Sequence, residues 1–167
     1  MPVHRRSVGD TFDGTFYAGR QVQCVKKSVL IPYSAAQMFE LVDRVEDYPG
    51  FLPWCAGARV LETHPGGKTA KLDIDYHGVR ASFTTLNDNT PPTLIVVKLK
   101  DGPFRTLHGE WRFRELRADA CKVEFDLTYE FSTGLLDRVI GPVFNHIATT
   151  FIDAFVKRAE AVYGLPG

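Results

Sequence analysis

Few side chains in this sequence have the type and spacing that catalysis or metal binding needs. The three cysteines, Cys24, Cys55 and Cys121, lie far apart without a CxxC pair, which argues against a zinc site or a disulfide scaffold and indicates free thiols in a reducing compartment. Cys55 would need a neighbouring base to act as a nucleophile, and no motif supplies one, so a buried structural thiol is the better interpretation. His146 and Asp153 could orient a general base from one edge of a helix, although a surface or interface pair is the simpler interpretation. We therefore expect no catalytic residue and no metal site.

The most unusual stretch is EDYPGFLPWC at residues 46–55, which combines two prolines with a dense group of apolar side chains. Pro49 and Pro53 lack an amide hydrogen and restrict the residue before them, so a long helix is excluded here. Each aromatic ring in the stretch brings roughly 150–250 Å² of surface that is stable only when buried. The apolar side chains are Tyr48, Phe51, Leu52 and Trp54. A short, stiff segment of this composition must pack against another part of the fold.

Alternating apolar and polar residues predict the sheet against which this segment packs. In VEFDLTYEFS, residues 123–132, every second side chain from Val123 to Phe131 is apolar, which is typical of a strand with one buried face. Similar segments, separated by turn signals at 65–67, 77–78, 87–92, 101–102 and 116–120, predict seven strands in one strongly bent antiparallel sheet. The large rings expected on its buried face are Tyr76, Phe83, Trp111, Phe125, Tyr129 and Phe131.

Two helices are expected. Ser34 is a suitable N-cap for a helix over 35–44. A longer helix near 136–163 either begins at Pro142 or is kinked there, because proline is tolerated only in a first turn. Its apolar stripe at 3.6-residue spacing comprises Ile140, Val143, Phe144, Ile147, Phe151, Ala154, Phe155 and Val162. A bent sheet buries such a stripe by curling around the helix, which leaves room for a cavity between them.

The composition fits one soluble domain without a global electric field. The 167 residues include 20 basic and 20 acidic side chains, which gives a formal net charge of zero. No segment has the run of roughly 18 apolar residues that a membrane span needs, and the N-terminus lacks the apolar core of a secretory signal. We expect residues 1–20 to be a mobile extension, residues 21–164 to form the domain, and the protein to be cytoplasmic.

Three stretches resemble one known family. They are SVLIPYSAAQMFELVDRVEDYPGFLPWCAGARVLE (28–62), GPFRTLHGEWRFREL (102–116) and GLLDRVIGPVFNHIATTFIDAFVKRAEAVYG (134–164). Together they resemble the RatA-type and ubiquinone-binding START-like proteins of the polyketide cyclase superfamily, often labelled oligoketide cyclase or lipid-transport proteins. The most specific part is the YPxFLPxC element at 48–55. The resemblance implies an α+β helix-grip fold, in which seven curved antiparallel strands surround a long C-terminal helix.

The resemblance also implies a hydrophobic ligand, ubiquinone or a related prenyl lipid, held without catalysis in support of respiratory-chain quinone function. The protein would exchange this ligand during transient membrane contact. In this fold the segment at 46–55 lies at the cavity mouth, where it would be either a detachable lid or a plain cap on the core. The expected ligand-binding residues are Phe51, Leu52, Trp54, Tyr76, Phe83, Trp111, Phe125, Tyr129, Val143, Ile147, Phe151 and Phe155.

Two alternatives follow from the same resemblance. RatA-type proteins are described as toxins that bind the large ribosomal subunit and block subunit association, with an antitoxin protein as a further partner. Such binding needs an exposed basic surface, for which the candidates are Arg112, Arg114 and Arg117, although Glu124 and Asp126 have the parity to neutralise them across strands. A polyketide cyclase-like enzyme is the third alternative and ranks last, because no carboxylate has inward parity.

Overall fold

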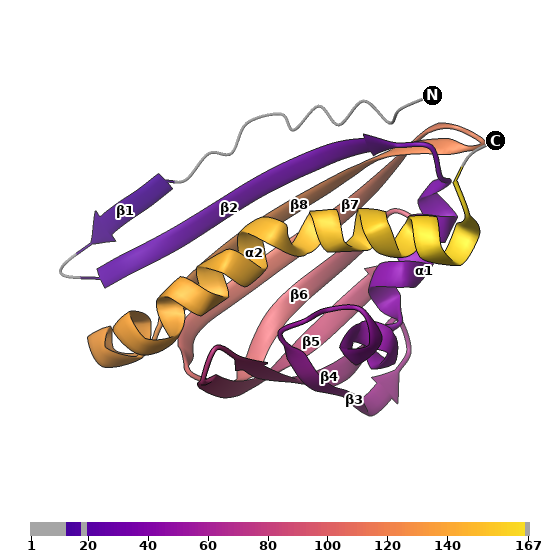
Figure 1. Ribbon diagram of the computed structural model, residues 1–167. Helices are drawn as coiled ribbons and strands as arrows, with labels where there is room; N and C mark the ends of the chain where they lie inside the picture. The colour runs from indigo at the N-terminus through magenta and orange to yellow at the C-terminus, as the bar shows by residue number, and fades with distance from the viewer. Residues whose placement is uncertain (1–12, 18–19, 166–167) are drawn as a thin grey trace.

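In a computed structural model, which describes residues 13–17 and 20–165, an antiparallel sheet curves around one long helix (Figure 1). The strand order is β1-β2-β8-β7-β6-β5-β4-β3, so the chain crosses from β2 to the opposite edge before it returns strand by strand. The helices are α1 (Ala35–Asp43), the 3-10 helix η1 (Val45–Gly50) and α2 (Gly134–Tyr163). The strands are β1 (Asp13–Tyr17), β2 (Arg20–Ile31), β3 (Cys55–His64), β4 (Gly67–Tyr76), β5 (Val79–Thr90), β6 (Leu94–Asp101), β7 (Phe104–Arg117) and β8 (Ala120–Phe131).

The seven expected strands are β2 to β8, and the curved sheet around a C-terminal helix is confirmed. An eighth strand, β1, pairs with β2 at the sheet edge and lies inside the stretch assigned to the extension. Residues 1–12 and 18–19 of that extension lie outside the described residues. The turn expected at 87–92 is shorter, because β5 continues to Thr90.

The N-cap expected at Ser34 is present at the start of α1, and contacts at the other end of α1 position the 3-10 helix η1 that follows. The Ser34 side chain accepts a hydrogen bond from the Gln37 amide at 3.1 Å, and the Gln37 side chain accepts from the Ser34 amide at 2.9 Å. At the other end, Lys68 lies 3.0 Å from the Asp43 carboxylate, which also accepts from the Asn89 amide at 2.7 Å. These bonds attach the end of α1 to β4 and β5, and so position η1.

The long helix α2 is continuous through Pro142 and begins at Gly134, so the alternative of a start at Pro142 is wrong. Its side chains buried against the sheet are Ile140, Phe144, Ile147, Ala148, Ile152, Phe155, Val156 and Ala159. Val162, expected in the stripe, is instead exposed, because the buried face ends one turn earlier. By length and composition α2 could span a membrane, but here its apolar face packs on the sheet.

The C-terminal end of α2 is held by hydrogen bonds to the region around α1. The Tyr33 hydroxyl donates to the Gly164 carbonyl at 2.7 Å, and the Tyr163 hydroxyl donates to the Gln37 carbonyl at 3.0 Å. The helix is therefore fixed near its C-terminal end, beside α1 (Figure 1).

Candidate ligand-binding cavity

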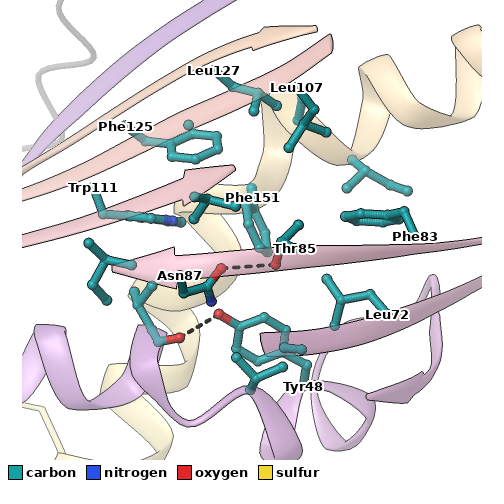
Figure 2. A pocket seen from close by; sticks show the side chains of 18 of the residues that line it. Tyr48, Leu72, Phe83, Thr85, Asn87, Leu107, Trp111, Phe125, Leu127 and Phe151 are labelled. Carbon is teal, nitrogen blue, oxygen red and sulfur yellow. Dashed lines mark hydrogen bonds between the residues drawn. The ribbon is translucent and has the colours of Figure 1, made fainter. Parts of the chain in front are cut away.

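A cavity of about 80 Å³ lies between the sheet and α2 (Figure 2). Strands β4 to β8 supply one wall, α2 supplies another, and the chain from α1 through η1 to Trp54 closes the space. The lining residues are Val42, Val45, Tyr48, Trp54, Ala70, Leu72, Phe83, Thr85, Asn87, Ile95, Val97, Leu107, Gly109, Trp111, Phe125, Leu127, Phe144, Ile147, Ala148 and Phe151. The lining is dominated by aliphatic and aromatic side chains, so the cavity suits an apolar group.

The cavity exists because small residues from three elements meet among large side chains. Ala70 of β4, Gly109 of β7 and Ala148 of α2 all line it. A Cβ atom at Gly109 would lie 3.3 Å from Leu127 Cδ1 and 3.6 Å from Val97 Cβ, so a larger residue there would fill part of the space.

Phe151 lies at the centre of an aromatic cluster beside the cavity (Figure 2). Its ring centroid is 5.4 Å from that of Trp111 and 5.6 Å from that of Phe125, both on the sheet. It is also 5.9 Å from Trp54 and 5.1 Å from Phe155. These edge contacts are favourable ring geometries. Phe151 therefore joins α2 to the sheet and to residues 46–55, the covering segment of the cavity.

The segment at 46–55 is a 3-10 helix followed by a turn, which fits the two prolines. Leu52 and Trp54 are 2% and 4% exposed, so both point inward. Phe51 is half-buried between the ring of Phe155, at 5.3 Å, and the guanidinium of Arg158, at 5.0 Å. The segment is held by these ring contacts and by hydrogen bonds to α1 and β4, from the Tyr48 hydroxyl to the Val42 carbonyl and from the Asp75 amide to the Trp54 carbonyl.

An open groove of about 630 Å³ lies on the outer side of this segment. It runs between residues 50–54 and α2, with Tyr76 at one side. Trp54 lines both the groove and the inner cavity, so its side chain forms the partition between them. The polar side chains along the groove are His146, Thr150, Asp153, Lys157 and Arg158.

The expected ligand-binding residues fall into three groups. Those lining the cavity are Trp54, Phe83, Trp111, Phe125, Ile147 and Phe151. Those lining the groove are Phe51, Leu52 and Tyr76, together with Trp54. Tyr129, Val143 and Phe155 line neither space. Tyr129 instead packs at 4.7 Å against the ring of Phe144, which itself lines the cavity.

Sequence reasoning placed Thr85 on the inward face but missed the two other polar groups of the cavity wall, on Asn87 and Tyr48. Asn87 was assigned to a turn, yet it continues the inward parity of Phe83 and Thr85 along β5. The Thr85 hydroxyl donates to the Asn87 side-chain oxygen at 2.9 Å. Tyr48 was expected only as apolar surface, and its hydroxyl donates to the Val42 carbonyl at 2.5 Å. The strand parity alone could have located Asn87.

Burial keeps the Tyr48 phenol and the Cys55 and Cys121 thiols in their neutral forms. Burial raises the pKa of Tyr48 well above its usual range. Burial also raises the pKa of Cys55 to about 11 and that of Cys121 to about 12, so neither thiol is a nucleophile at neutral pH. His146 stacks on Tyr76 at 5.8 Å and lies with Asp153 in the groove, away from the cavity lining. The described residues contain no cluster that could hold a metal ion.

The three candidate ribosome-facing arginines are each beside carboxylates. Arg112 pairs with Glu110, lies 3.3 Å from Asp126 and 3.8 Å from Glu124. Arg114 lies 3.8 Å from Glu124. Arg117 pairs at 3.0 Å with Asp119 in the β7–β8 turn. The cross-strand neutralisation expected from parity is therefore present in the structure.

Comparison with known proteins identifies the family of this chain. The family described as polyketide cyclase / dehydrase and lipid transport matches residues 31–156. The chain belongs to this family. Its relatives within the family carry names of two kinds, a ribosome- or stress-associated toxin and a coenzyme Q-binding protein.

The persistence and stress-resistance toxin PasT of Escherichia coli O6:H1 is 44% identical over 83% of this chain and 88% of its own. The ribosome association toxin RatA of Vibrio cholerae is 44% identical over 84% of this chain and 97% of its own. The mitochondrial coenzyme Q-binding protein COQ10 homolog B of Xenopus laevis is 28% identical over 83% of this chain and 58% of its own.

Two solved structures share the fold. The 18 kDa protein CC1736 from Caulobacter crescentus is 31% identical, with a TM-score of 0.65 over 85% of this chain and 99% of its own. The Zhui aromatase/cyclase from Streptomyces sp. R1128 is 21% identical, with a TM-score of 0.69 over 83% and 94%. The second likeness shows the fold alone. The same architecture is thus found in a protein named an aromatase/cyclase.

Proposed function

We propose that this polyketide cyclase-family protein binds an apolar ligand, ubiquinone or a related prenyl lipid, in the cavity between sheet and α2. It acts as a non-enzymatic carrier in the cytoplasm that exchanges its ligand by transient membrane contact. The observation that carries the proposal is the predominantly apolar lining of the cavity, closed by the Trp54 segment. The family description includes lipid transport, and one relative is named a coenzyme Q-binding protein, which supports this ligand class.

The size of the cavity implies that binding requires an opening. Small-molecule sites usually measure roughly 300–1,000 Å³, whereas this cavity has about 80 Å³. Displacing Trp54 would join it to the groove of about 630 Å³. The joined space would admit a ring headgroup and part of a prenyl tail.

Affinity from the tail alone is limited. Moving a five-carbon isoprene unit out of water is worth up to about 4 kcal/mol, at roughly 0.8 kcal/mol per carbon. A membrane lipid is already out of water, so little of this remains when the protein takes it from a bilayer. Selectivity must therefore come from the headgroup and its contacts in the cavity.

Ubiquinone with a short prenyl tail should quench the tryptophan fluorescence of the protein, because Trp54 and Trp111 both line the cavity. Each single Trp→Phe variant should lose part of the quenching while the remaining tryptophan still responds. Titration against lipid vesicles with and without the quinone measures the effect. Unchanged fluorescence at saturating quinone, in a sample shown to be folded, would reject the cavity as the binding site.

Ribosome association is the second candidate function, and the relatives named RatA at 44% identity favour it. The arginine surface on β7 gives it limited support, because Arg112 is surrounded by Glu110, Glu124 and Asp126. Arg114 and Arg117 are more exposed, each with one neighbouring carboxylate. These two are the better candidates for contact with ribosomal phosphates.

Reversing the charge of Arg114 and Arg117 to glutamate should weaken co-sedimentation with large ribosomal subunits and reduce the salt dependence of binding. Stability should change by less than about 1 kcal/mol, since both arginine side chains are mostly exposed to solvent. Arg80→Glu is a matched control, because Arg80 is an exposed arginine paired with Asp75 at the distant β4–β5 turn. If the wild type, the Arg114 and Arg117 charge-reversal variant and Arg80→Glu all bind the large ribosomal subunit equally, the β7 arginines are excluded as the ribosome-binding surface.

Cyclase chemistry is not proposed. The cavity lining contains no carboxylate and no imidazole among its described residues, and its one phenol is Tyr48, whose hydroxyl is already used by the Val42 carbonyl. The likeness to an aromatase/cyclase is at 21% identity and concerns the fold.

A further inference from the structure

The cavity wall has one polar end. Apart from the indole N–H groups of its two tryptophans, the polar side chains in the lining are Tyr48, Thr85 and Asn87. Thr85 and Asn87 come from β5 and are 4% and 9% exposed, while Tyr48 comes from η1 on the covering segment. Figure 2 shows the three side chains facing one another across the lower part of the cavity.

The hydrogen bonds among Tyr48, Thr85 and Asn87 leave the side-chain amide nitrogen of Asn87 without an acceptor. Thr85 donates to the Asn87 side-chain oxygen, which turns the amide nitrogen of Asn87 toward the Tyr48 hydroxyl (Figure 2). Tyr48 uses its own proton on the Val42 carbonyl, so its hydroxyl oxygen acts only as an acceptor. The Asn87 amide nitrogen makes no hydrogen bond to any of the described residues within hydrogen-bonding geometry. A buried amide therefore presents N–H donors to an otherwise apolar space.

The sheet does not require this side chain. The backbone of Asn87 pairs with Lys68 of β4 and with Val97 of β6 whatever its side chain is. Its one side-chain bond runs to Thr85, two residues away on the same strand, so it connects no separate elements. An unpaired buried donor lowers stability, because it loses its hydrogen bonds to water without replacing them. A ligand that accepts from this donor would remove that cost.

We propose that Asn87 selects ligands that carry a carbonyl oxygen, by donating a hydrogen bond from its side-chain amide at the polar end of the cavity. The ligand class is a compact apolar molecule with a ketone or quinone oxygen, inserted with that oxygen toward the amide nitrogen of Asn87. A hydrocarbon of the same shape leaves the amide unpaired and is disfavoured. This inference rests on the proposed function, since it assigns the selectivity of the same cavity.

Acetophenone and ethylbenzene are matched probes, because they share ring and carbon number and differ in the carbonyl. Nitrogen-15 NMR titration of the full chain gives both affinities and follows the Asn87 side-chain resonances directly. Acetophenone should move an Asn87 side-chain N–H proton downfield, as a new hydrogen bond to a carbonyl does, and ethylbenzene should not produce this downfield shift. In Asn87→Leu, the ratio of acetophenone to ethylbenzene affinity should fall about tenfold. Ile31→Val, a change at a buried apolar residue of β2 that does not line the cavity, should leave the ratio unchanged.

The outcomes separate the two proposals. Binding of both probes with the same ratio in the wild type and in Asn87→Leu overturns the role of Asn87 and leaves the cavity as a binding site. Binding of neither probe overturns the proposed function and this inference with it. If Asn87→Leu does not fold, the wild-type resonances decide, and an Asn87 side chain that ignores acetophenone overturns the inference.

Discussion

Replacing Phe151 with alanine should destabilise the protein by about 3 kcal/mol and increase its uptake of small apolar ligands. Complete burial would give a cost of roughly 3–5 kcal/mol, and Phe151 is only half-buried, so the lower end applies. The ring contacts Trp54, Trp111 and Phe125 beside the cavity, so its removal enlarges the space that holds a ligand. Denaturant unfolding measures the first effect, and titration with acetophenone or short-tail ubiquinone measures the second.

Phe113→Ala is the matched control for this experiment. Phe113 is 1% exposed and packs on Phe39 at 5.6 Å and on Trp111 at 6.2 Å, but it does not line the cavity. It should cost at least as much stability without improving ligand uptake. If both variants gain ligand binding equally, general loosening of the core explains the gain and the assignment of Phe151 to the site is contradicted.

Trp54→Ala should accelerate ligand release at least tenfold while destabilising the protein by about 3–5 kcal/mol. Trp54 is 4% exposed and separates the inner cavity from the open groove, so its removal joins the two spaces. Stopped-flow dilution of a quinone-loaded sample measures the release rate. Trp54→Phe keeps a ring in the partition, and its release rate should lie close to that of the wild type.

This experiment distinguishes the two interpretations of the proline-bounded segment. A lid gives faster exchange in Trp54→Ala, with increased amide hydrogen exchange confined to residues 48–55. A plain cap on the core gives the stability loss with an unchanged release rate. The contacts of Phe51 with Phe155 and Arg158 are the ones that must break when a lid opens.

Much of the fold could be predicted because its signals are local. The alternation in residues 123–132 depends only on the two-residue period of a strand, and the structure has β8 at Ala120–Phe131. The N-cap at Ser34 depends on bonds between residues three apart, and both are present. The parity that puts Arg112 on the same face of the sheet as Glu124 and Asp126 likewise predicted the neutralised arginine surface.

Only the tertiary structure decided where the site lies and how large it is. The apolar stripe of α2 includes both Phe151 and Phe155, yet just the first lines the cavity, because the crossing of helix and sheet selects among neighbouring rings. The void depends on Ala70, Gly109 and Ala148, which are distant in sequence and meet through packing. Asn87 becomes part of a polar end of the cavity only because Tyr48 lies beside it, and the position of Tyr48 is set by η1. Period and capping act over a few residues, whereas a cavity is the space left between elements, so only their packing can define it.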